Sequence, residues 1–217
     1  MRYRVRGIEI RSENAAKPHS SAGKWVLEWI CGLPRNCRVV DIGCGKLRYT
    51  IPLCKRVVCV TAVDSAIQLT RVQTLRGKHV CVVDYIKRYL QNVRLCTLEH
   101  GAWVNWAHDV ALCTNVLSAI PNLRSRRKLL SDARASLRIG GKILITTQFR
   151  NSHFKAWANN PNAEKYLDGY LVRSNRGTSF YGLIGPNRLR QLCLREGFAV
   201  EEYGTRGEIA FVLATRT

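Results

Sequence analysis

The stretch Val39-Val40-Asp41-Ile42-Gly43-Cys44-Gly45 decides the predicted fold. A short apolar run rich in β-branched residues ends at an acidic residue and leads directly into a Gly-x-Gly turn. Glycine lets the backbone turn tightly and approach a ligand closely, because no Cβ stands in the way. The helix expected next would present its N-terminal amides to that ligand. The stretch therefore predicts a buried parallel strand that opens into a ligand-binding turn.

A second apolar run, over residues 56–64, ends at Asp64. This acid follows Gly45 by about 20 residues, the distance at which dinucleotide-binding folds place a ribose-binding carboxylate. A carboxylate at that position can accept hydrogen bonds from both hydroxyls of a ribose. The two glycines form a weak motif alone, and the acids at the ends of two successive strands make it specific.

The rest of the chain alternates strands with helices. Further strands are predicted over 92–100, 108–116 and 140–148, and a closing hairpin pairs 198–203 with 208–215 across the turn at 204–207. Helices are predicted over 20–31, 65–75, 124–137 and 186–197, while 78–91 fits either a strand over 79–85 or a long helix. This order predicts an α/β fold: a seven-stranded, mostly parallel sheet with helices on both faces and an antiparallel C-terminal hairpin.

At this point the chain resembles the class I S-adenosylmethionine-dependent methyltransferases. Asp41, Gly43 and Gly45 match the family's acidic-x-Gly-x-Gly-x-Gly motif, and Leu47 stands where the family has its third glycine. Asp64 matches the ribose-binding acid. Residues 109–121 look like the fourth strand and its turn, residues 137–145 like the fifth strand, and the closing hairpin like the last two. The resemblance covers about residues 20–217 and implies S-adenosylmethionine as the cofactor.

The resemblance also implies a set of site residues. The cofactor-binding residues would be Asp41, Gly43, Cys44, Gly45, Asp64, Ser65, Glu99, Thr114 and Asn115, and the catalytic candidates are His153, Asn115 and Tyr181. Glu99 is preferred as the adenine-side acid, with Asp84 as the alternative. His19 is a further candidate base. A nicotinamide-binding enzyme is the main rival, but Arg48 stands where the longer G-x-G-x-x-G motif would have its last glycine.

Methyl transfer from a sulfonium is an in-line displacement, so the protein mainly aligns the acceptor and excludes water. A general base is needed only where the acceptor must first lose a proton. The turn at 114–118 lacks the Asp/Asn-Pro-Pro-aromatic sequence of exocyclic-amine DNA methyltransferases, and no Pro-Cys dipeptide offers the nucleophile of cytosine-C5 enzymes. The acceptor and its methylated atom therefore stay open.

Composition predicts one domain over 1–217, with an N-terminal extension at 1–19 and a substrate-facing insertion at 148–186. The nine cysteines show no ligand spacing, so we expect neither a metal nor a disulfide framework. The N-terminus is too charged for a secretory signal, and no apolar run is long enough to span a bilayer. We therefore expect a cytoplasmic protein with no membrane partner.

The charge is the unusual bulk property. There are 35 Lys and Arg residues against 15 Asp and Glu, a formal net charge of +20. A field of this sign attracts polyanions, and Arg173 and Arg176 alternate with aromatic residues in the insertion, so nucleic acid is one candidate acceptor. A small-molecule acceptor and a catalytically silent, cofactor-binding partner subunit are the alternatives. The sequence does not specify an oligomeric state.

Overall fold

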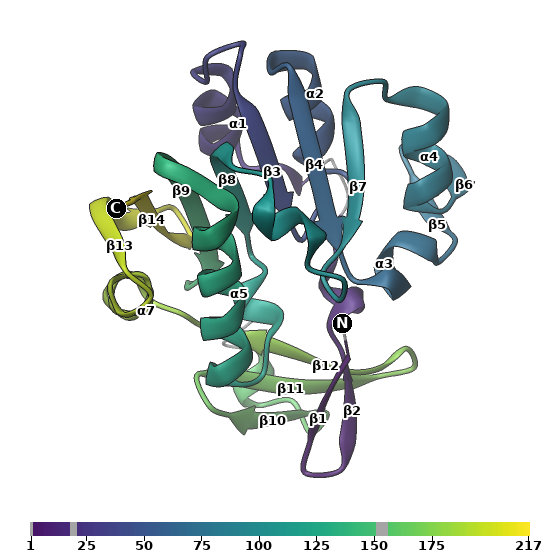
Figure 1. The fold of residues 1–217 in the computed structure, drawn as a ribbon. Coiled ribbons are helices and arrows are strands. Elements are labelled where there is room, and N and C mark those ends of the chain that lie inside the picture. Colours follow the sequence, from purple (N-terminus) through teal and green to yellow (C-terminus); the bar gives the residue numbers. More distant parts are fainter. Residues whose placement is uncertain (1, 18–20, 151–155) are drawn as a thin grey trace.

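The computed structural model describes residues 2–17, 21–150 and 156–217, and Figure 1 shows their arrangement in two sheets with the helices packed around the upper one. The strands of the main sheet are β3 (Arg38–Ile42), β4 (Cys59–Asp64), β7 (Val93–Thr97), β8 (His108–Thr114), β9 (Leu137–Gln148), β13 (Phe198–Arg206) and β14 (Ile209–Arg216). The second sheet contains β1 (Arg2–Val5), β2 (Ile8–Arg11), β10 (Ala163–Tyr166), β11 (Gly169–Ser174) and β12 (Gly177–Gly182).

The helices are α1 (Lys24–Cys31), α2 (Thr50–Arg56), α3 (Ala66–Thr70), α4 (Val82–Tyr89), α5 (Leu123–Ser136) and α7 (Pro186–Arg195). Short 3-10 turns are η1 (Ser12–Ala15), η3 (Ala102–Asn105) and η4 (Leu117–Ala119), and β5 (Gln73–Leu75) pairs with β6 (Lys78–Val80). No helix of the described residues is long and apolar enough to cross a membrane.

The main sheet confirms the predicted fold class. Within the described residues its seven strands follow the order β13-β14-β9-β8-β3-β4-β7, with β14 antiparallel to its neighbours and the central strands parallel. Side chains alternate between its two faces: Val60 and Ala62 of β4 join the apolar clusters under α2, while Val63 joins the cluster under α5 and α7. This alternation is the period of two that a strand imposes. Because both faces are covered, the buried positions of these strands are mostly apolar.

Two predicted elements are wrong in extent. The helix expected over 65–75 ends at Thr70, and residues 73–80 form the small β5–β6 hairpin instead. Its turn residues, Arg76 and Gly77, both have positive φ (47° and 80°), the pattern of a tight hairpin turn. Residues 82–89 are helical, so the strand alternative for 79–85 also fails. Helix α1 begins at Lys24 rather than at residue 20, with Gly23 as its N-cap.

The second sheet joins two segments that are distant in the sequence. Strand β2 of the N-terminal extension pairs in parallel with β12 of the insertion, and Ile10 lies opposite Thr178. Val5, Ile10, Leu171 and Phe180 form a small buried core on one face of this sheet. The sequence interpretation gave neither segment a secondary structure. The N-terminal hairpin and the insertion are thus one layer, which lies below the main sheet in Figure 1.

A buried ion pair attaches this second sheet to α5. The Arg126 side chain is 0% exposed and donates to both carboxylate oxygens of Asp168, at 2.5 and 2.8 Å. Its Nε also donates to the Ile120 carbonyl oxygen at 2.9 Å, and its guanidinium lies 5.6 Å from the centre of the Phe180 ring. Arg126 is therefore buried although α5 is a strongly basic helix, because its partner comes from the insertion.

Candidate functional site

A cavity opens at the carboxyl ends of β3, β4 and β8, where parallel α/β sheets place their ligands. Of the residues that the sequence assigned to the site, Asp41, Gly43, Cys44, Gly45, Asp64, Thr114, Asn115 and Tyr181 line it. Ser65 and Glu99 are not among its lining residues, and His153 and His19 lie outside the described residues. The remaining walls come from the N-terminal segment, α5 and β12.

The glycine turn has the conformation that only glycine adopts without strain. Gly43 has a φ of +71°, and a Cβ added there would lie 2.3 Å from Val116 Cγ2. Gly45 has a φ of +55°, with Ala16 Cβ as the nearest atom at 3.5 Å from its added Cβ. Leu47 keeps the same left-handed conformation, with a φ of +60°, and its fully buried side chain packs in the cluster between α2 and α4. The third turn position therefore retains the backbone shape of a glycine.

The amides of this turn point away from the cavity. Gly43 and Cys44 both donate to the Val63 carbonyl oxygen, at 2.7 and 3.0 Å, and so tie the turn to β4. Burial raises the pKa of the Cys44 thiol well above its usual value, which keeps it protonated. These two amides are therefore already used within the protein, and a ligand can contact only other backbone atoms of the turn.

Asp64 links the end of β4 to the same turn. Its Oδ2 accepts the Gly45 N–H at 2.8 Å, and its Oδ1 accepts the Ser65 N–H at 2.7 Å. Burial raises the pKa of Asp64, and the two amide donors oppose that rise. The Ser65 hydroxyl also donates to Oδ1, at 3.4 Å, so Oδ2 is the oxygen that keeps a free lone pair. Asp64 can thus hold the turn and accept further hydrogen bonds from a ligand.

Asp41 lies deeper, below the turn. It is 2% exposed, and the Thr50 hydroxyl donates to its Oδ2 at 2.6 Å. Burial raises its pKa to about 6, against the stabilising effect of that hydrogen bond. The folded state therefore binds a proton between the unfolded pKa, near 4, and pH 6. Stability contributed by the protonated carboxyl is present below that window and is lost as the pH rises through it.

This linkage predicts the effect of Asp41→Asn, which keeps the acceptor oxygen and removes the charge. We expect the variant to unfold at higher urea concentration than the parent chain, with a gain of about 2–3 kcal/mol at pH 7.5. The gain shrinks by about 1 kcal/mol at pH 5, where the parent carboxyl is mostly protonated. Urea titrations followed by circular dichroism at the two pH values measure it. A loss of stability at pH 7.5 would contradict the assignment.

Three buried side-chain oxygens at this cavity have no hydrogen-bond partner among the described residues. They are Glu13 Oε2, Gln68 Oε1 and Asn115 Oδ1, and all three residues line the cavity. A buried acceptor without a partner costs about 1–3 kcal/mol, so a ligand with N–H and O–H donors would relieve this cost. These hydrogen-bond acceptors of the cavity therefore fit a ligand that carries hydroxyl and amino groups.

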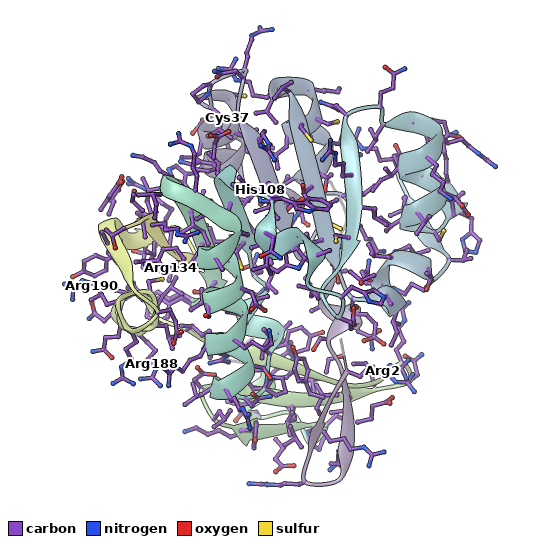
Figure 2. All side chains as sticks on the ribbon, viewed as in Figure 1. Arg2, Cys37, His108, Arg134, Arg188 and Arg190 are labelled. Carbon is purple, nitrogen blue, oxygen red and sulfur yellow. The ribbon has the colours of Figure 1, made fainter. Side chains whose placement is uncertain are left out.

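The sequence interpretation missed the N-terminal segment as part of the site. Glu13 is 7% exposed, its Oε1 pairs with the Arg2 Nε at 3.2 Å, and the Arg71 Nη2 donates to its carbonyl oxygen at 2.6 Å. Ser12 Oγ donates to the Ala119 carbonyl oxygen at 2.7 Å. Arg2, which pairs with Glu13, is labelled in Figure 2. One signal was available: apolar residues alternate on either side of the Arg6–Gly7 turn, as in a hairpin.

The structure separates the two candidates for the adenine-side acid. Asp84 lies in the first turn of α4 and does not end a strand. Glu99 follows β7 and accepts the Ala66 N–H at 3.2 Å, while its neighbour Leu98 lines the cavity. Burial raises the pKa of the Tyr3 hydroxyl, and the nearby carboxylates of Glu99 and Asp64 raise it further. The N-terminal hairpin thus brings an aromatic ring to the end of the cavity where both acids lie.

The candidate catalytic residues come from different parts of the fold. Asn115 and Tyr181 line the cavity from β8 and β12, and burial raises the pKa of Tyr181. His108, labelled in Figure 2, starts β8 at the opposite end from Asn115 and bonds the Ser136 carbonyl and the Thr61 hydroxyl oxygen. Burial lowers the pKa of His108, so it remains neutral inside the sheet. The roles of Asn115 and Tyr181 stay predictions.

Comparison with known proteins gives the family of this chain. The chain is 33% identical over 212 residues to the Escherichia coli protein YmfD, covering 98% of this chain and 95% of that protein. It belongs to the YmfD family. No family model matches the chain.

Solved structures give the fold of this family. An S-adenosylmethionine-dependent methyltransferase from Methanosarcina mazei superposes with a TM-score of 0.62, at 15% identity, over 90% of this chain and 98% of that one. The 1,6-didemethyltoxoflavin N1-methyltransferase of Burkholderia thailandensis, solved with its substrate and S-adenosylhomocysteine, gives 0.59 at 18% identity, over 94% and 79%. The chain has the class I methyltransferase fold.

Proposed function

We propose that this chain transfers the methyl group of S-adenosylmethionine to a small molecule. The observation that carries the proposal is the contact between Asp64 and Gly45 at the carboxyl end of the central strands. This hydrogen bond places the glycine turn next to a carboxylate at the position where such folds bind a ribose. The adjoining cavity contains buried oxygens without hydrogen-bond partners among the described residues. The methyltransferase fold supports the same interpretation.

The residues present fit this cofactor. Asp64 would accept the ribose hydroxyls, and the unpartnered oxygens of Glu13 and Gln68 would accept from its amino or hydroxyl groups. When bound, S-adenosylmethionine supplies an electrophilic methyl group on a sulfonium. The task of the chain is then to align the acceptor and exclude water. The second sheet supports that task, because it covers the cavity with the N-terminal segment and β12.

The form of the cavity supports a small acceptor over nucleic acid. Its walls come from separate segments on several sides, including η1, η4 and α5. Of the two arginines suggested for nucleic-acid contact, Arg173 lies 4.0 Å from the Glu164 carboxylate, and neither Arg173 nor Arg176 lines the cavity. The net charge is the observation that remains in favour of nucleic acid. Binding of RNA that falls steeply with salt and weakens in Arg173→Ala would overturn the small-molecule proposal.

The test of the cofactor is calorimetric titration of the full chain with S-adenosylhomocysteine, with NADH as the negative control. We expect Asp64→Asn to weaken binding about 5- to 150-fold, the equivalent of about 1–3 kcal/mol, because a ribose hydroxyl loses its charged partner. Asp84→Asn is the matched control and should leave the affinity unchanged, since Asp84 lies on α4.

Three outcomes would contradict the proposal. They are tighter binding of NADH than of S-adenosylhomocysteine, equal effects of Asp64→Asn and Asp84→Asn, and no binding of S-adenosylhomocysteine at all. If S-adenosylhomocysteine binds and no acceptor is methylated, the silent-subunit alternative replaces the proposal.

A further inference from the structure

We infer that the acceptor is an uncharged heteroaromatic ring compound that stacks on Tyr181 and donates a ring N–H to Asn115. This inference rests on the proposed function and names the substrate class of the same cavity. Three observations carry it: a wall of aromatic rings, an uncharged cavity lining next to Tyr181, and an unpartnered amide oxygen.

The insertion builds the aromatic wall, which consists of Tyr181, Tyr170 and Trp157. Tyr170 and Tyr181 are direct partners on β11 and β12, so their side chains share one face of the second sheet. The Trp157 ring lies 4.6 Å from that of Tyr181 and 6.4 Å from that of Tyr170, measured between centroids. All three rings remain half-buried. Because Trp157 packs against Tyr181, the Tyr181 ring is held in place as a flat surface.

This wall meets the cavity where β8 and β9 end. Tyr181 lines the cavity together with Asn115, Ser118 and Gln148. The Gln148 N–H donates to Ser118 Oγ at 3.2 Å, and the Asn115 N–H donates to the Thr146 carbonyl oxygen at 2.8 Å. These bonds fix the two strand ends next to each other. Strand β12, which carries Tyr181, also contacts η4, the turn that follows Asn115, so Tyr181 and Asn115 line the same side of the cavity.

The lining of this part of the cavity is uncharged. The described charged side chains that line the cavity come from other segments: the N-terminal segment, the glycine turn, β3, β4 and α5. On α5, Lys128 and Asp132 pair with each other at 2.6 Å. Arg126 lies behind Phe180, fully buried and paired with Asp168. Lys165, the partner of Tyr170 on β10, is a charged neighbour of the wall, and it lies two strands away from Tyr181. A phosphate or an ammonium group placed at Tyr181 would lose hydration without gaining a partner there, which disfavours a charged ring substituent at this position.

Asn115 supplies the single directional contact. Its Oδ1 is buried and has no partner among the described residues. Its φ of +60° places it in the left-handed region that asparagine tolerates better than most other side chains. A planar ring that lies on Tyr181 and carries an N–H at its edge satisfies this oxygen. An aliphatic compound of the same size would lose the stacking contribution.

The experiment is calorimetric titration of the full chain, saturated with S-adenosylhomocysteine, with three neutral ring probes: 4-quinolone, indole and lumichrome. We expect at least one to bind, and Tyr181→Ala to weaken its binding about 5- to 100-fold, the loss typical of one stacking contact. Tyr203→Ala, on the exposed hairpin strand β13, is the matched control and should leave binding unchanged. Thermal unfolding of both variants checks that they fold, and Tyr181→Leu serves if Tyr181→Ala does not.

A second variant tests the directional contact. Asn115→Gly removes the side chain without straining the left-handed backbone. We expect this variant to bind 4-quinolone, which carries a ring N–H, more weakly than the parent chain does. Its affinity for N-methyl-4-quinolone, which lacks that N–H and binds more weakly, should be unchanged. Cyclohexylamine is the cationic, aliphatic probe and should not bind.

The outcomes separate this inference from the proposed function. If S-adenosylhomocysteine binds but none of the three rings does, or if cyclohexylamine binds better than they do, the inference is overturned and the proposed function stands. Equal effects of Tyr181→Ala and Tyr203→Ala overturn it as well. If S-adenosylhomocysteine itself does not bind, the proposed function fails and the inference falls with it.

Discussion

Asp168→Ala is expected to lower the free energy of unfolding by about 3–5 kcal/mol, the cost of leaving a buried charge without its partner. The Arg126 guanidinium is fully buried between α5 and the second sheet, and Asp168 accepts two of its hydrogen bonds. The Ile120 carbonyl oxygen is its one remaining hydrogen-bond acceptor in the described residues, and a neutral carbonyl does not compensate a full charge. Urea denaturation followed by far-UV circular dichroism measures the change.

The control is Asp132→Ala, on the same helix. Its partner Lys128 has a side chain that is 75% exposed, so this pair is expected to contribute no more than about 0.5 kcal/mol. Arg126→Met in the Asp168→Ala background should recover much of the loss, since it removes the buried charge itself. If Asp168→Ala and Asp132→Ala cost the same, the ion pair does not hold the two sheets together.

Gly43→Ala is the second change with a large expected effect. The new Cβ would lie 2.3 Å from Val116 Cγ2, and alanine would have to adopt a φ of +71°. The backbone conformation costs about 1–2 kcal/mol and the steric overlap a further 1–3 kcal/mol, so we expect a total loss of about 2–5 kcal/mol. Moving the turn away from Val116 also shifts the cavity wall, and S-adenosylhomocysteine should bind at least about tenfold more weakly.

Two further variants separate the contributions. At Gly45 the nearest atom is 3.5 Å from an added Cβ, so Gly45→Ala carries only the backbone cost of about 1–2 kcal/mol. Val116→Ala combined with Gly43→Ala should recover the steric part and leave the backbone part. Thermal and urea unfolding of the four proteins measure these differences. Equal stability losses at Gly43 and Gly45 would show that the contact with Val116 is not rigid.

The main sheet could be predicted from the sequence because its strands carry local signals. The apolar runs that end at Asp41 and Asp64, separated by a glycine turn, indicate successive buried parallel strands. The closing hairpin follows from its two apolar runs, but its turn lies at residues 207–208 and not at 204–207 as predicted. The helix over 65–75 failed for a local reason as well. The spacing of Ile67, Leu69 and Val72 fits a helix, but the Arg76–Gly77 turn allows the end of that segment to pair as a hairpin.

The candidate site could be predicted only in part. Asp64, Gly43 and Gly45 lie where the strand pattern placed them, since their positions depend on neighbours in the sequence. Glu13 reaches the cavity through η1, and η1 is held by contacts to Ala119 and Arg71. Such contacts leave no periodic trace in one sequence. Asp168 could not be predicted as the partner of Arg126 either, because the two residues lie 42 positions apart in the sequence.

The pairing of β2 with β12 also has a consequence for biosynthesis. The ribosome releases the N-terminal hairpin first, and the strand that covers Ile10 follows only after most of the chain, on the order of ten seconds later at ordinary elongation rates. An isolated two-stranded hairpin is marginally stable in water, so the N-terminal hairpin is not stably folded until β12 is available to pair with it. The ligand cavity is thus closed late in synthesis, and a nascent chain that ends before β12 has the parallel strands of the main sheet but lacks β13, β14 and the β12 wall of the cavity.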